Sequence, residues 1–546
     1  MKSPSEYDVV IIGGGINGAG IARDAALRGL TVLLLEQNDF GSGTTSWSSR
    51  LIHGGLRYLE YGEIPLVYES LRERRVLQTT AKHLVRKLRI NIPVYENSRR
   101  GLLLLRAGMI AYDLLSLGNP LPRHRVLRRE EFLRNEPGLN PSGLRGGVQY
   151  YDAQVPYAER LVIENIVAAE SAGAVVRNYS RVTAIEIREG QVKRILYSDR
   201  KTGAEFEVDA KIVVNATGPW VDAVLATMNL SMPRLIGGTK GSHIIVGRFK
   251  AAPTDAFYVE AHADGRPLFI IPWNNQYLIG TTDIRYDGDP ADASASTAEI
   301  EYLLAETNRI FPHANLGTQD IHYVYAGVRP LPHRSAGPES AITRKHIIRR
   351  HHDAKGLWTV IGGKLTTYRS LSEDVVDRIV RKDGLKAGAC RTREENLPGA
   401  NSLEEAEAEL RQFQKLTPQC RERLLGVYGG RVRRILELAR DDPPFCATVD
   451  SQQTVLAAEV VFSLRCEFAT NLIDILHRRT MTGLAADLGA SAAQGVAAVA
   501  ATELGWTDAE TQRQLDALRG YNARLATHQG SSAVGARHCG RTTAFD

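Results

Sequence analysis

Three glycines near the start of the chain have a spacing that suits phosphate chemistry. Gly13-Gly14-Gly15-Ile16-Asn17-Gly18 satisfies the pattern G-x-G-x-x-G. Gly13 permits a tight turn, Gly15 lets the backbone approach a pyrophosphate, and Gly18 allows a following helix to pack closely on a strand. The amide groups at the start of that helix carry partial positive charge, so they attract an anion.

The segment around these glycines has the order strand, helix, strand. An apolar run at residues 9–12 precedes the glycines, a helical pattern at 17–28 follows them, and a second apolar run at 31–35 ends in Glu36. A carboxylate about 20 residues after the glycines suits the hydroxyl groups of a ribose. We therefore predict a bound dinucleotide. The alternative is a plain glycine-rich turn with Glu36 as a solvated strand end.

Two later segments bear on the identity of that dinucleotide. Ala216-Thr217-Gly218 follows an apolar strand at 210–215 and resembles the second signature of flavoproteins with two dinucleotide folds. The segment Gly362-Gly363-Lys364-Leu365-Thr366-Thr367-Tyr368 opens a helical pattern at 365–381. It resembles the segment whose helix start faces the flavin pyrimidine ring, where the helix dipole stabilises negative charge. Both segments favour FAD over NAD; the alternative for the second is a plain helix cap.

One histidine lies in a context that suits proton transfer. His53 is followed by Gly54 and Gly55, which leave room for a flavin or a substrate beside the imidazole. Imidazole titrates near neutrality, so His53 is a candidate general base. The alternative is that His53 positions the flavin and that Tyr58 or Lys364 handles the proton.

Composition sets the limits within which these residues act. A chain of 546 residues, 43% hydrophobic and 24% charged, is typical of a globular protein with two or three domains. The net charge of +6 leaves anionic substrates or lipids open. The five cysteines form no CxxC motif, so we predict reduced thiols and no metal site. Neither a signal peptide nor an apolar run of about 18 residues is evident, so a spanning helix is not expected.

These elements together predict an α/β fold with three parts. We expect an FAD-binding two-dinucleotide-fold (Rossmann-like) domain, a substrate domain built on a mixed β-sheet that includes strands at 268–271 and 277–279, and an α-helical C-terminal domain. The arginine-dense segment 82–137 is interpreted as an insertion. The expected boundaries are residues 1–389 for the oxidoreductase part (FAD-binding about 1–81, 150–235 and 350–389; substrate or cap about 82–149 and 236–349) and 390–546 for the C-terminal domain, helical over 402–506 and disordered after about 530.

A longer run makes a family resemblance specific. Residues 48–60, SSRLIHGGLRYLE, resemble the flavin-linked glycerol-3-phosphate dehydrogenases. Four other segments agree, namely 13–20 (GGGINGAG), 215–220 (NATGPW), 326–330 (AGVRP) and 362–369 (GGKLTTYR), and residues 460–480 resemble the C-terminal domain of that family. One departure is Arg50, where the family pattern has a lysine, and an arginine fork makes different contacts from an ammonium group.

The resemblance implies the oxidation of sn-glycerol 3-phosphate to dihydroxyacetone phosphate by hydride transfer to FAD N5, with electrons passed to a membrane quinone. The implied catalytic residues are His53, Arg57, Arg329 and Lys364, and the implied substrate-binding residues are Arg57, Tyr58, Arg329, Arg344 and Lys364. Arginine binds phosphate oxygens through two parallel hydrogen bonds. We therefore assign the phosphate to Arg329 and Arg344, and we place Arg57 and Lys364 nearer the reacting carbon. The alternative for each arginine is a surface salt bridge.

The expected FAD-binding residues come from the same segments. They are Gly13, Gly15, Asn17, Gly18, Glu36, Thr45, Ser46, Ser49, Leu51, His53, Val182, Ala216, Gly218, Trp220, Gly363, Lys364, Leu365 and Thr366.

A second surface is predicted from residues 101–117, GLLLLRAGMIAYDLLSL. Arg106 and Asp113 are seven residues apart and share one face of a helix, and the rest of that helix is broadly apolar. A basic rim flanks it, formed by Arg99, Arg100, Arg123, Arg125, Arg128 and Arg129. This pattern is typical of a helix that lies in an anionic lipid interface, and the alternative is a buried core helix beside solvated arginines. With the family resemblance, it predicts a cytoplasmic protein attached peripherally to the inner face of the cytoplasmic membrane.

Other functions compete with this interpretation. An oxidase of the same fold would pass electrons to oxygen, and an amine or amino-acid oxidase would share the flavin site but would not need phosphate-binding arginines. A non-catalytic or nucleic-acid-binding flavoprotein is a remote alternative, because the arginines here flank leucines rather than aromatic residues. We expect no nucleic-acid partner, and a homodimer remains open.

Overall fold

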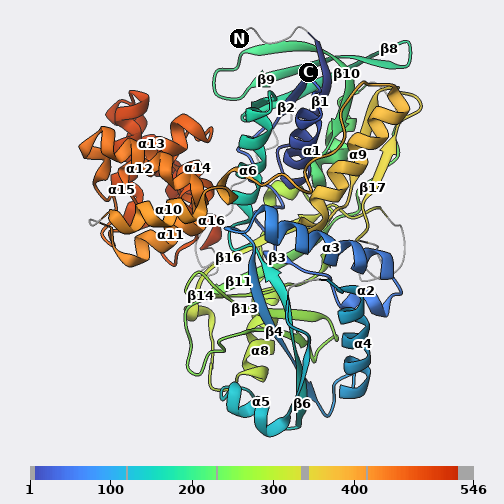
Figure 1. Cartoon of the computed structure of the whole chain (residues 1–546), viewed down its shortest axis with the longest axis vertical. Helices are drawn as coiled ribbons and strands as arrows, with labels where there is room; N and C mark the ends of the chain where they lie inside the picture. The colour runs from blue at the N-terminus through green and yellow to red at the C-terminus, as the bar shows by residue number, and fades with distance from the viewer. Residues whose placement is uncertain (1–5, 119–120, 229–231, 334–343, 414–415, 527–546) are drawn as a thin grey trace, which may run out of the picture.

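The computed structural model describes residues 6–118, 121–228, 232–333, 344–413 and 416–526. Two β-sheets lie one above the other, and the C-terminal helices lie beside the upper part of the molecule (Figure 1). The chain passes from one sheet to the other several times, so residues far apart in sequence meet where the two sheets adjoin. The α/β fold class predicted from the sequence is confirmed.

The first sheet has eight strands and contains the predicted βαβ unit. β1 (Glu6–Ile12) pairs in parallel with β2 (Val32–Leu35) on one side and with β10 (Glu205–Asn215) on the other. The carboxyl ends of these parallel strands therefore lie at one edge of the sheet, which is where ligands bind in such folds. The strand order is β17 (Ile347–Arg350), β18 (Leu357–Ile361), β10, β1, β2 and β7 (Val175–Arg177), with β8 (Ser180–Arg188) and β9 (Gln191–Asp199) joined to β10 through β9.

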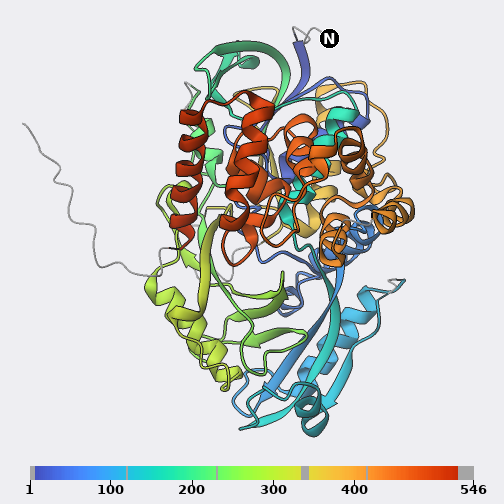
Figure 2. The ribbon, with the colours of Figure 1, turned by 90° about the vertical axis from the view of Figure 1, so that its left-hand side faces the viewer.

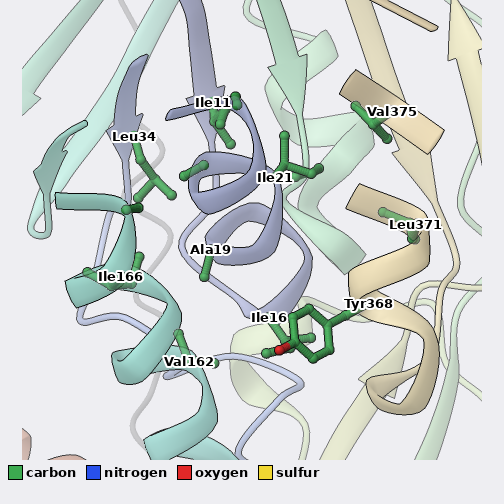
Figure 3. Close-up of a cluster of buried hydrophobic side chains, with 14 of the residues drawn as sticks. Ile11, Ile16, Ala19, Ile21, Leu34, Val162, Ile166, Tyr368, Leu371 and Val375 are labelled. Atoms are coloured by element: carbon green, nitrogen blue, oxygen red, sulfur yellow. The ribbon is translucent and has the colours of Figure 1, made fainter. Parts of the chain in front are cut away.

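Helix α1 (Ile16–Leu27) forms the centre of the core that supports this edge. It lies between α6 (Ala158–Ser171) and α9 (Tyr368–Asp383), as Figure 3 shows. Ile21 and Val375 belong to one buried cluster with residues of both neighbouring helices and of β1 and β2. Burying an aliphatic side chain of this size contributes about 1.5–3 kcal/mol, so the cluster fixes α1 against the sheet.

The second sheet has ten strands and is mixed, because β12 (Ala256–Glu260) runs parallel to β4 (Arg86–Tyr95). The arginine-dense segment interpreted as an insertion contributes β4 and β5 (Arg125–Arg128) to this sheet, where both pair with β6 (Leu144–Gln154). The boundary expected at residue 150 falls inside β6. The order is β15 (Ile284–Arg285), β11 (Thr239–Val246), β14 (Gln276–Gly280), β13 (Pro267–Trp273), β12, β4, β6 and β3 (Leu51–Ile52), with β16 (Ile321–Arg329) beside β11.

Short helices surround the second sheet. α8 (Thr297–Ile310) contacts β11 and β14, and it starts at a capping box in which Ser296 accepts from the Glu299 amide. α2 (Arg57–Glu60), α3 (Ile64–Thr80) and α4 (Leu102–Leu115) follow one another down one side of this sheet (Figure 1), and α3 and α4 contact β6. α5 (Arg129–Asn135) packs on β5 and β6, and α7 (Val221–Leu225) follows β10.

The C-terminal part is helical, as predicted, and its helices continue past residue 506. Figure 2 shows these helices in front of the first sheet. They are α10 (Leu403–Gln412), α11 (Pro418–Tyr428), α12 (Val432–Asp441), α13 (Ala457–Cys466), α14 (Leu472–Asp474) with a π-helical turn at Ile475–Arg479, α15 (Ala490–Leu504) and α16 (Asp508–Leu525). The tail expected to be disordered after about residue 530 lies outside the described residues. Among the described helices, none is both long and apolar enough to cross a membrane.

Candidate active site

The glycine turn between β1 and α1 is closely packed on two sides and open on the third. Gly13 has a φ of +108°, and a Cβ there would lie 2.8 Å from the carbonyl oxygen of Ala216. A Cβ on Gly18 would lie 1.8 Å from the oxygen of Gly13, so only glycine lets α1 approach the turn. A Cβ on Gly15 would meet nothing closer than Thr45 Oγ1 at 3.5 Å, which leaves space in front of the helix start.

That open side has the polar groups that a dinucleotide needs. Gly15, the N-cap residue of α1, has no side chain to cap the helix, and among the described residues Asn17 Oδ1 is buried without a hydrogen-bond partner. The carboxylate of Glu36 accepts from the amides of Gly14 (2.7 Å) and Asn38 (2.8 Å), which fixes it beside the turn. Burial nevertheless raises the pKa of Glu36. A helix start with glycine at the N-cap, an unpartnered amide oxygen and an adjacent carboxylate fit a pyrophosphate and a ribose.

The other expected FAD-binding residues lie around this turn or along its continuation. Thr45 Oγ1 accepts from the Ile16 amide at 3.2 Å, and Ser46 Oγ donates to the Gly41 carbonyl at 2.7 Å. Val182 belongs to the same buried cluster as Leu35, the residue before Glu36. Ser49 Oγ pairs with His243 Nε2 at 2.8 Å, Leu51 lies in β3, and Gly218 and Trp220 begin and end a short turn after β10.

The segment that carries Lys364 meets both the glycine turn and His53. Asn17 Nδ2 donates to the Gly362 carbonyl at 3.3 Å, and a Cβ on Gly363 would lie 2.9 Å from that same nitrogen. The His53 amide donates to Thr366 Oγ1 at 3.2 Å. The turn after β18 thus holds together segments that are 313 and 345 positions apart in the sequence. Leu365 and Thr366 lie in a short 3₁₀ turn at Leu365–Thr367, and α9 starts only at Tyr368.

His53 and Lys364 both have perturbed titration. Burial, with the positive charge of Lys364 next, lowers the pKa of His53 to about 4, so the imidazole is neutral at pH 7. Burial also lowers the pKa of Lys364 to about 8. Lys364 Nζ donates to Ser70 Oγ at 2.9 Å and lies 4.5 Å from the centre of the Tyr58 ring. Perturbed groups of this kind cluster at functional sites.

Arg329 and Arg344 converge on one carboxylate, and we call Asp283, Arg329 and Arg344 the Asp283 cluster. Arg329 donates to Asp283 Oδ1 at 3.0 Å, and Arg344 donates to Asp283 Oδ2 at 3.1 Å. Arg329 also donates to Thr281 Oγ1 at 2.9 Å. Burial lowers the pKa of Arg329 to about 10, which leaves it charged at pH 7. After burial, the nearby positive charge of Arg344 also lowers the pKa of both Arg329 and Lys364, so its guanidinium lies near both groups.

The family segment at residues 48–60 contains two arginines, Arg50 and Arg57. Arg57 begins α2, and its side chain lies outside the described residues. Arg50 is buried and binds Glu159 with both arms of its fork, at 2.7 and 2.8 Å. Arg50 therefore joins the loop after Glu36 to α6.

Several residues at the site were not anticipated from the sequence. Asp283, Ser70 and Asp152 pair with predicted residues or lie beside them, and each comes from a different element. Asp283 had a weak signal, because it follows the predicted strand at 277–279 by a few positions. Ser70 and Asp152 had none, since each lies in an ordinary helix or strand pattern.

Comparison with known proteins first identifies the class. Residues 8–378 match the family described as FAD dependent oxidoreductase, and residues 390–511 match the C-terminal domain of alpha-glycerophosphate oxidase. The first match alone covers more than half of the chain. The protein is thus an FAD-dependent oxidoreductase, which confirms the cofactor predicted from the glycine segments.

The relatives narrow the class further. A glycerol-3-phosphate dehydrogenase of Synechocystis sp. is 45% identical over 94% of this chain and 96% of its own length. A glycerol-3-phosphate dehydrogenase 2 of Mycobacterium tuberculosis is 36% identical over 97% of this chain and 89% of its own. The chain belongs to the family of FAD-dependent glycerol-3-phosphate dehydrogenases.

Solved structures agree with this assignment. The glycerol-3-phosphate dehydrogenase of Bacillus halodurans, solved in complex with FAD, is 27% identical and superimposes with a TM-score of 0.80 over 97% of both chains. The L-alpha-glycerophosphate oxidase of Mycoplasma pneumoniae is 18% identical with a TM-score of 0.55 over 73% of this chain, a likeness of fold alone.

Proposed function

We propose that this protein oxidises sn-glycerol 3-phosphate to dihydroxyacetone phosphate and passes the electrons through FAD to a membrane quinone. The observation that carries the proposal is the Asp283 cluster, in which two guanidinium groups share one carboxylate. The unbalanced positive charge, with Lys364 nearby, suits a phosphate dianion. The names of the relatives support the substrate.

The proposed reaction removes a hydride and a proton from the carbinol group of the substrate. When bound, FAD supplies the hydride acceptor at N5 of its ring. Arg329 and Arg344 hold the phosphate through charge-assisted hydrogen bonds, which orients the carbinol carbon. His53 is neutral at pH 7 because its pKa is about 4, so its ring nitrogen can accept the hydroxyl proton. Lys364 stabilises negative charge that develops on the oxygen, and Thr366 fixes the backbone of His53.

Anaerobic reduction of the bound flavin tests the substrate. The holoprotein is mixed with glycerol 3-phosphate without oxygen, and the flavin absorbance is followed by stopped flow. We expect bleaching with glycerol 3-phosphate and none with glycerol, lactate or glycine at the same concentration. Bleaching by glycine or lactate but not by the phosphate ester would refute the proposal in favour of an amino-acid or hydroxy-acid substrate.

The electron acceptor needs a separate measurement. With substrate present, the rate of quinone reduction is compared with the yield of hydrogen peroxide under air. We expect reduction of a soluble ubiquinone analogue to outpace peroxide formation by at least about tenfold. A stoichiometric peroxide yield without quinone reduction would identify an oxidase instead.

The outer face of α4 supports a membrane location. Its inner face, Leu105, Met109 and Tyr112, is buried, so α4 is neither a buried core helix nor fully solvated. The outer face exposes Leu103 by 83% and Leu104 by 64%. Large exposed apolar residues continue along α4 and on the neighbouring α2 and α3, namely Tyr61, Ile64, Tyr68, Ile110, Leu114 and Leu117. A soluble surface seldom gathers so many, whereas an interfacial helix requires them.

The basic rim around this face is only partly available. Arg100 pairs with Glu60 and Glu260, and Arg125 pairs with Glu131. Arg123, Arg128 and Arg129 are exposed. The apolar face therefore has the larger part in the proposed attachment of residues 99–129 to the inner face of the cytoplasmic membrane, and the arginines add a weaker attraction to anionic lipid.

The same helix touches the site from the inside. Tyr112 OH accepts from the Gly54 amide at 3.0 Å and donates to Asp152 Oδ2 at 2.8 Å. The turn that carries His53 is thus one hydrogen bond away from the helix proposed to lie in lipid. This proximity supports electron transfer to an acceptor dissolved in the membrane.

A further inference from the structure

The loop at residues 36–46 is bound to the glycine turn along its length. Its first residue, Glu36, accepts from the Gly14 amide at 2.7 Å. The Gly41 amide donates to the Gly14 carbonyl at 2.9 Å, and Thr45 Oγ1 accepts from the first amide of α1 at 3.2 Å. The position of this loop therefore sets where the Glu36 carboxylate, which is expected to bind the ribose, lies relative to the glycine turn.

Asp39 lies in this loop and is held from the other side by the C-terminal helices. Arg479 donates to both of its oxygens at 2.8 Å, and Arg478 Nε donates to Oδ2 at 2.5 Å. Asp39 is 1% exposed, so its charge depends on these partners. Asn178, which precedes β8, adds a hydrogen bond to Asp39 Oδ1 at 3.1 Å.

The two arginines are themselves fixed. They end the π-helical turn at Ile475–Arg479, a local widening of the helix that is often found at functional sites. Arg478 also donates to Asp474 Oδ1 at 2.8 Å, and Arg479 Nε donates to the Glu467 carbonyl at 2.7 Å. We call Asp39, Asp474, Arg478 and Arg479 the Asp39 cluster. It pairs two arginines with two aspartates, and all of its side chains are at most 6% exposed.

An apolar contact runs parallel to the ionic one. Phe40 is fully buried and meets the ring of Phe468, just after α13, edge to face at 5.9 Å between centroids. On its other side, Phe40 lies so near the glycine turn that a Cβ on Gly14 would be 2.7 Å from its ring. The C-terminal helices therefore reach the dinucleotide turn through two adjacent residues of the loop.

We propose that Arg478 and Arg479 are positioning residues for FAD, and that one function of the C-terminal helices is to hold the nucleotide-binding loop through Asp39. In the described structure, Arg478 and Arg479 contact neither the cations proposed to bind substrate nor the segment that carries His53. Without them, Asp39 would be a buried charge with too few partners, and the loop would move it toward water. That movement would displace Glu36, three residues earlier, from the glycine turn.

The test separates FAD affinity from folding. Asp39→Asn, Arg479→Gln and the double variant are purified as holoproteins, and the FAD dissociation constant is measured from the flavin fluorescence released on dilution. We expect each single variant to bind FAD at least about tenfold more weakly than wild type. Because both substitutions break the same contact, the double variant should be within about threefold of the weaker single variant. The apparent Tm is recorded for all variants.

The matched control is Glu164→Gln. Glu164 of α6 is equally buried and accepts from Arg431 of the C-terminal helices at 3.0 Å and from the Gly399 amide at 2.6 Å, so it joins these helices to the first sheet away from the Asp39 cluster. It should lower the Tm by a similar amount and change the FAD dissociation constant by less than about twofold. If Asp39→Asn and Arg479→Gln resemble this control in both measurements, the arginines support the fold alone and the proposal is wrong.

Arg479→Lys covers the case in which the neutral variants do not fold. It keeps the positive charge but loses the fork, so it leaves Asp39 compensated with one hydrogen bond fewer. We expect a folded protein whose FAD dissociation constant rises about threefold or more. An FAD affinity equal to that of wild type in folded Arg479→Lys, together with an unchanged flavin absorption spectrum, would overturn the proposal.

Discussion

The molecule has two clusters in which a pair of arginines meets aspartate, and they differ in charge balance and exposure. In the Asp283 cluster two guanidinium groups share one carboxylate, and the arginine side chains are 18% and 23% exposed. In the Asp39 cluster two arginines meet two carboxylates, and nothing is more than 6% exposed. The first arrangement leaves a cationic surplus that an incoming anion can neutralise. The second cluster is buried from solvent and its groups are paired with one another, which suits a permanent structural contact between two parts of the fold.

The pKa values of the aspartates reflect this difference only in part. Although burial alone would raise it, Arg479 and Arg478 hold the pKa of Asp39 well below its usual range. Arg329 and Arg344 likewise outweigh burial and lower the pKa of Asp283. Both carboxylates are therefore ionised at neutral pH. What separates the clusters is the number of arginines for each aspartate.

The largest effect is expected for the balanced cluster. Asp39→Asn leaves Arg478 and Arg479 with one carboxylate in a buried place, so the free energy of unfolding at pH 7 should fall by about 3 kcal/mol or more. The folded pKa of Asp39 is depressed, so its contribution is present above the unfolded pKa near 4 and is lost as the pH falls. The difference between wild type and variant should shrink by about 1.4 kcal/mol for each pH unit below about 4. Urea denaturation at pH 7 and pH 3 measures both values.

The control for this prediction is an exposed pair. Asp287, whose side chain is 78% exposed, binds Arg234 at 2.7 Å, and Asp287→Asn should cost about 0.5 kcal/mol or less. A stability difference for Asp39→Asn that is as small as this, or that stays constant from pH 7 to pH 3, would show that the charge balance of the Asp39 cluster does not matter.

The unbalanced cluster should matter for the substrate and little for stability. Arg329→Gln removes a charged donor to the phosphate, so kcat/KM for glycerol 3-phosphate should fall about a hundredfold, or about 2.7 kcal/mol. Any reduction of the flavin by unphosphorylated glycerol, tested at a far higher concentration than the phosphate ester, should have the same rate in the variant and in wild type. Stopped-flow flavin reduction with both alcohols measures this, with Arg125→Gln as a control, because Arg125 pairs with Glu131 at the surface. An equal loss with both alcohols would mean that Arg329 does not bind phosphate.

Sequence alone predicted the part of the site that is made by neighbours in the chain. Gly13, Gly15, Gly18 and Glu36 belong to one βαβ unit, whose local pattern fixes their geometry. The fold class followed from the same patterns. The family resemblance added Arg329, Arg344 and Lys364, which no local pattern connects. Their roles remain proposals, but the structure brings them into one site.

The hydrogen-bond and ion-pair partners of these residues could not be predicted from the sequence. Asp39 and Arg479 are 440 positions apart, and Lys364 and Ser70 are 294 apart. Such long-range contacts depend on how the two sheets and the C-terminal helices pack against one another. Arg50 shows the limit at a single position, because the departure from the family pattern was visible, whereas its partner Glu159 on α6 was not. The pairing of the segment at 82–137 with residues beyond 144 was not predicted for the same reason, since strand pairing between distant segments leaves no local signal.

Lys364 extends the cation count beside the Asp283 cluster, and pH can remove its charge. Burial lowers the pKa of Lys364 to about 8, so the group is protonated below pH 8 and loses its charge above it. If the cation stabilises the developing negative charge, the limiting rate of flavin reduction should fall about tenfold per unit above pH 8. Lys364→Arg should remove this fall up to pH 10. A rate that rises through pH 8 would instead make neutral Lys364 the base in place of His53.

The smallest effect concerns the surface of α4, where the arginine pairs again decide what is available. Arg100 and Arg125 are already neutralised by glutamates, so leucines rather than arginines should carry most of the binding to lipid. Leu104→Ser should lower the partition coefficient onto anionic liposomes about fivefold, or about 1 kcal/mol, because a half-inserted leucine gains part of its full transfer energy. Arg106→Gln should change it less and only at low salt. Leu504→Ser on α15, where Leu504 is 43% exposed, is the matched control and should have no effect, because α15 lies on the opposite side of the molecule from α4 (Figure 1). If Leu504→Ser weakens liposome binding as much as Leu104→Ser does, the outer face of α4 is not the membrane contact.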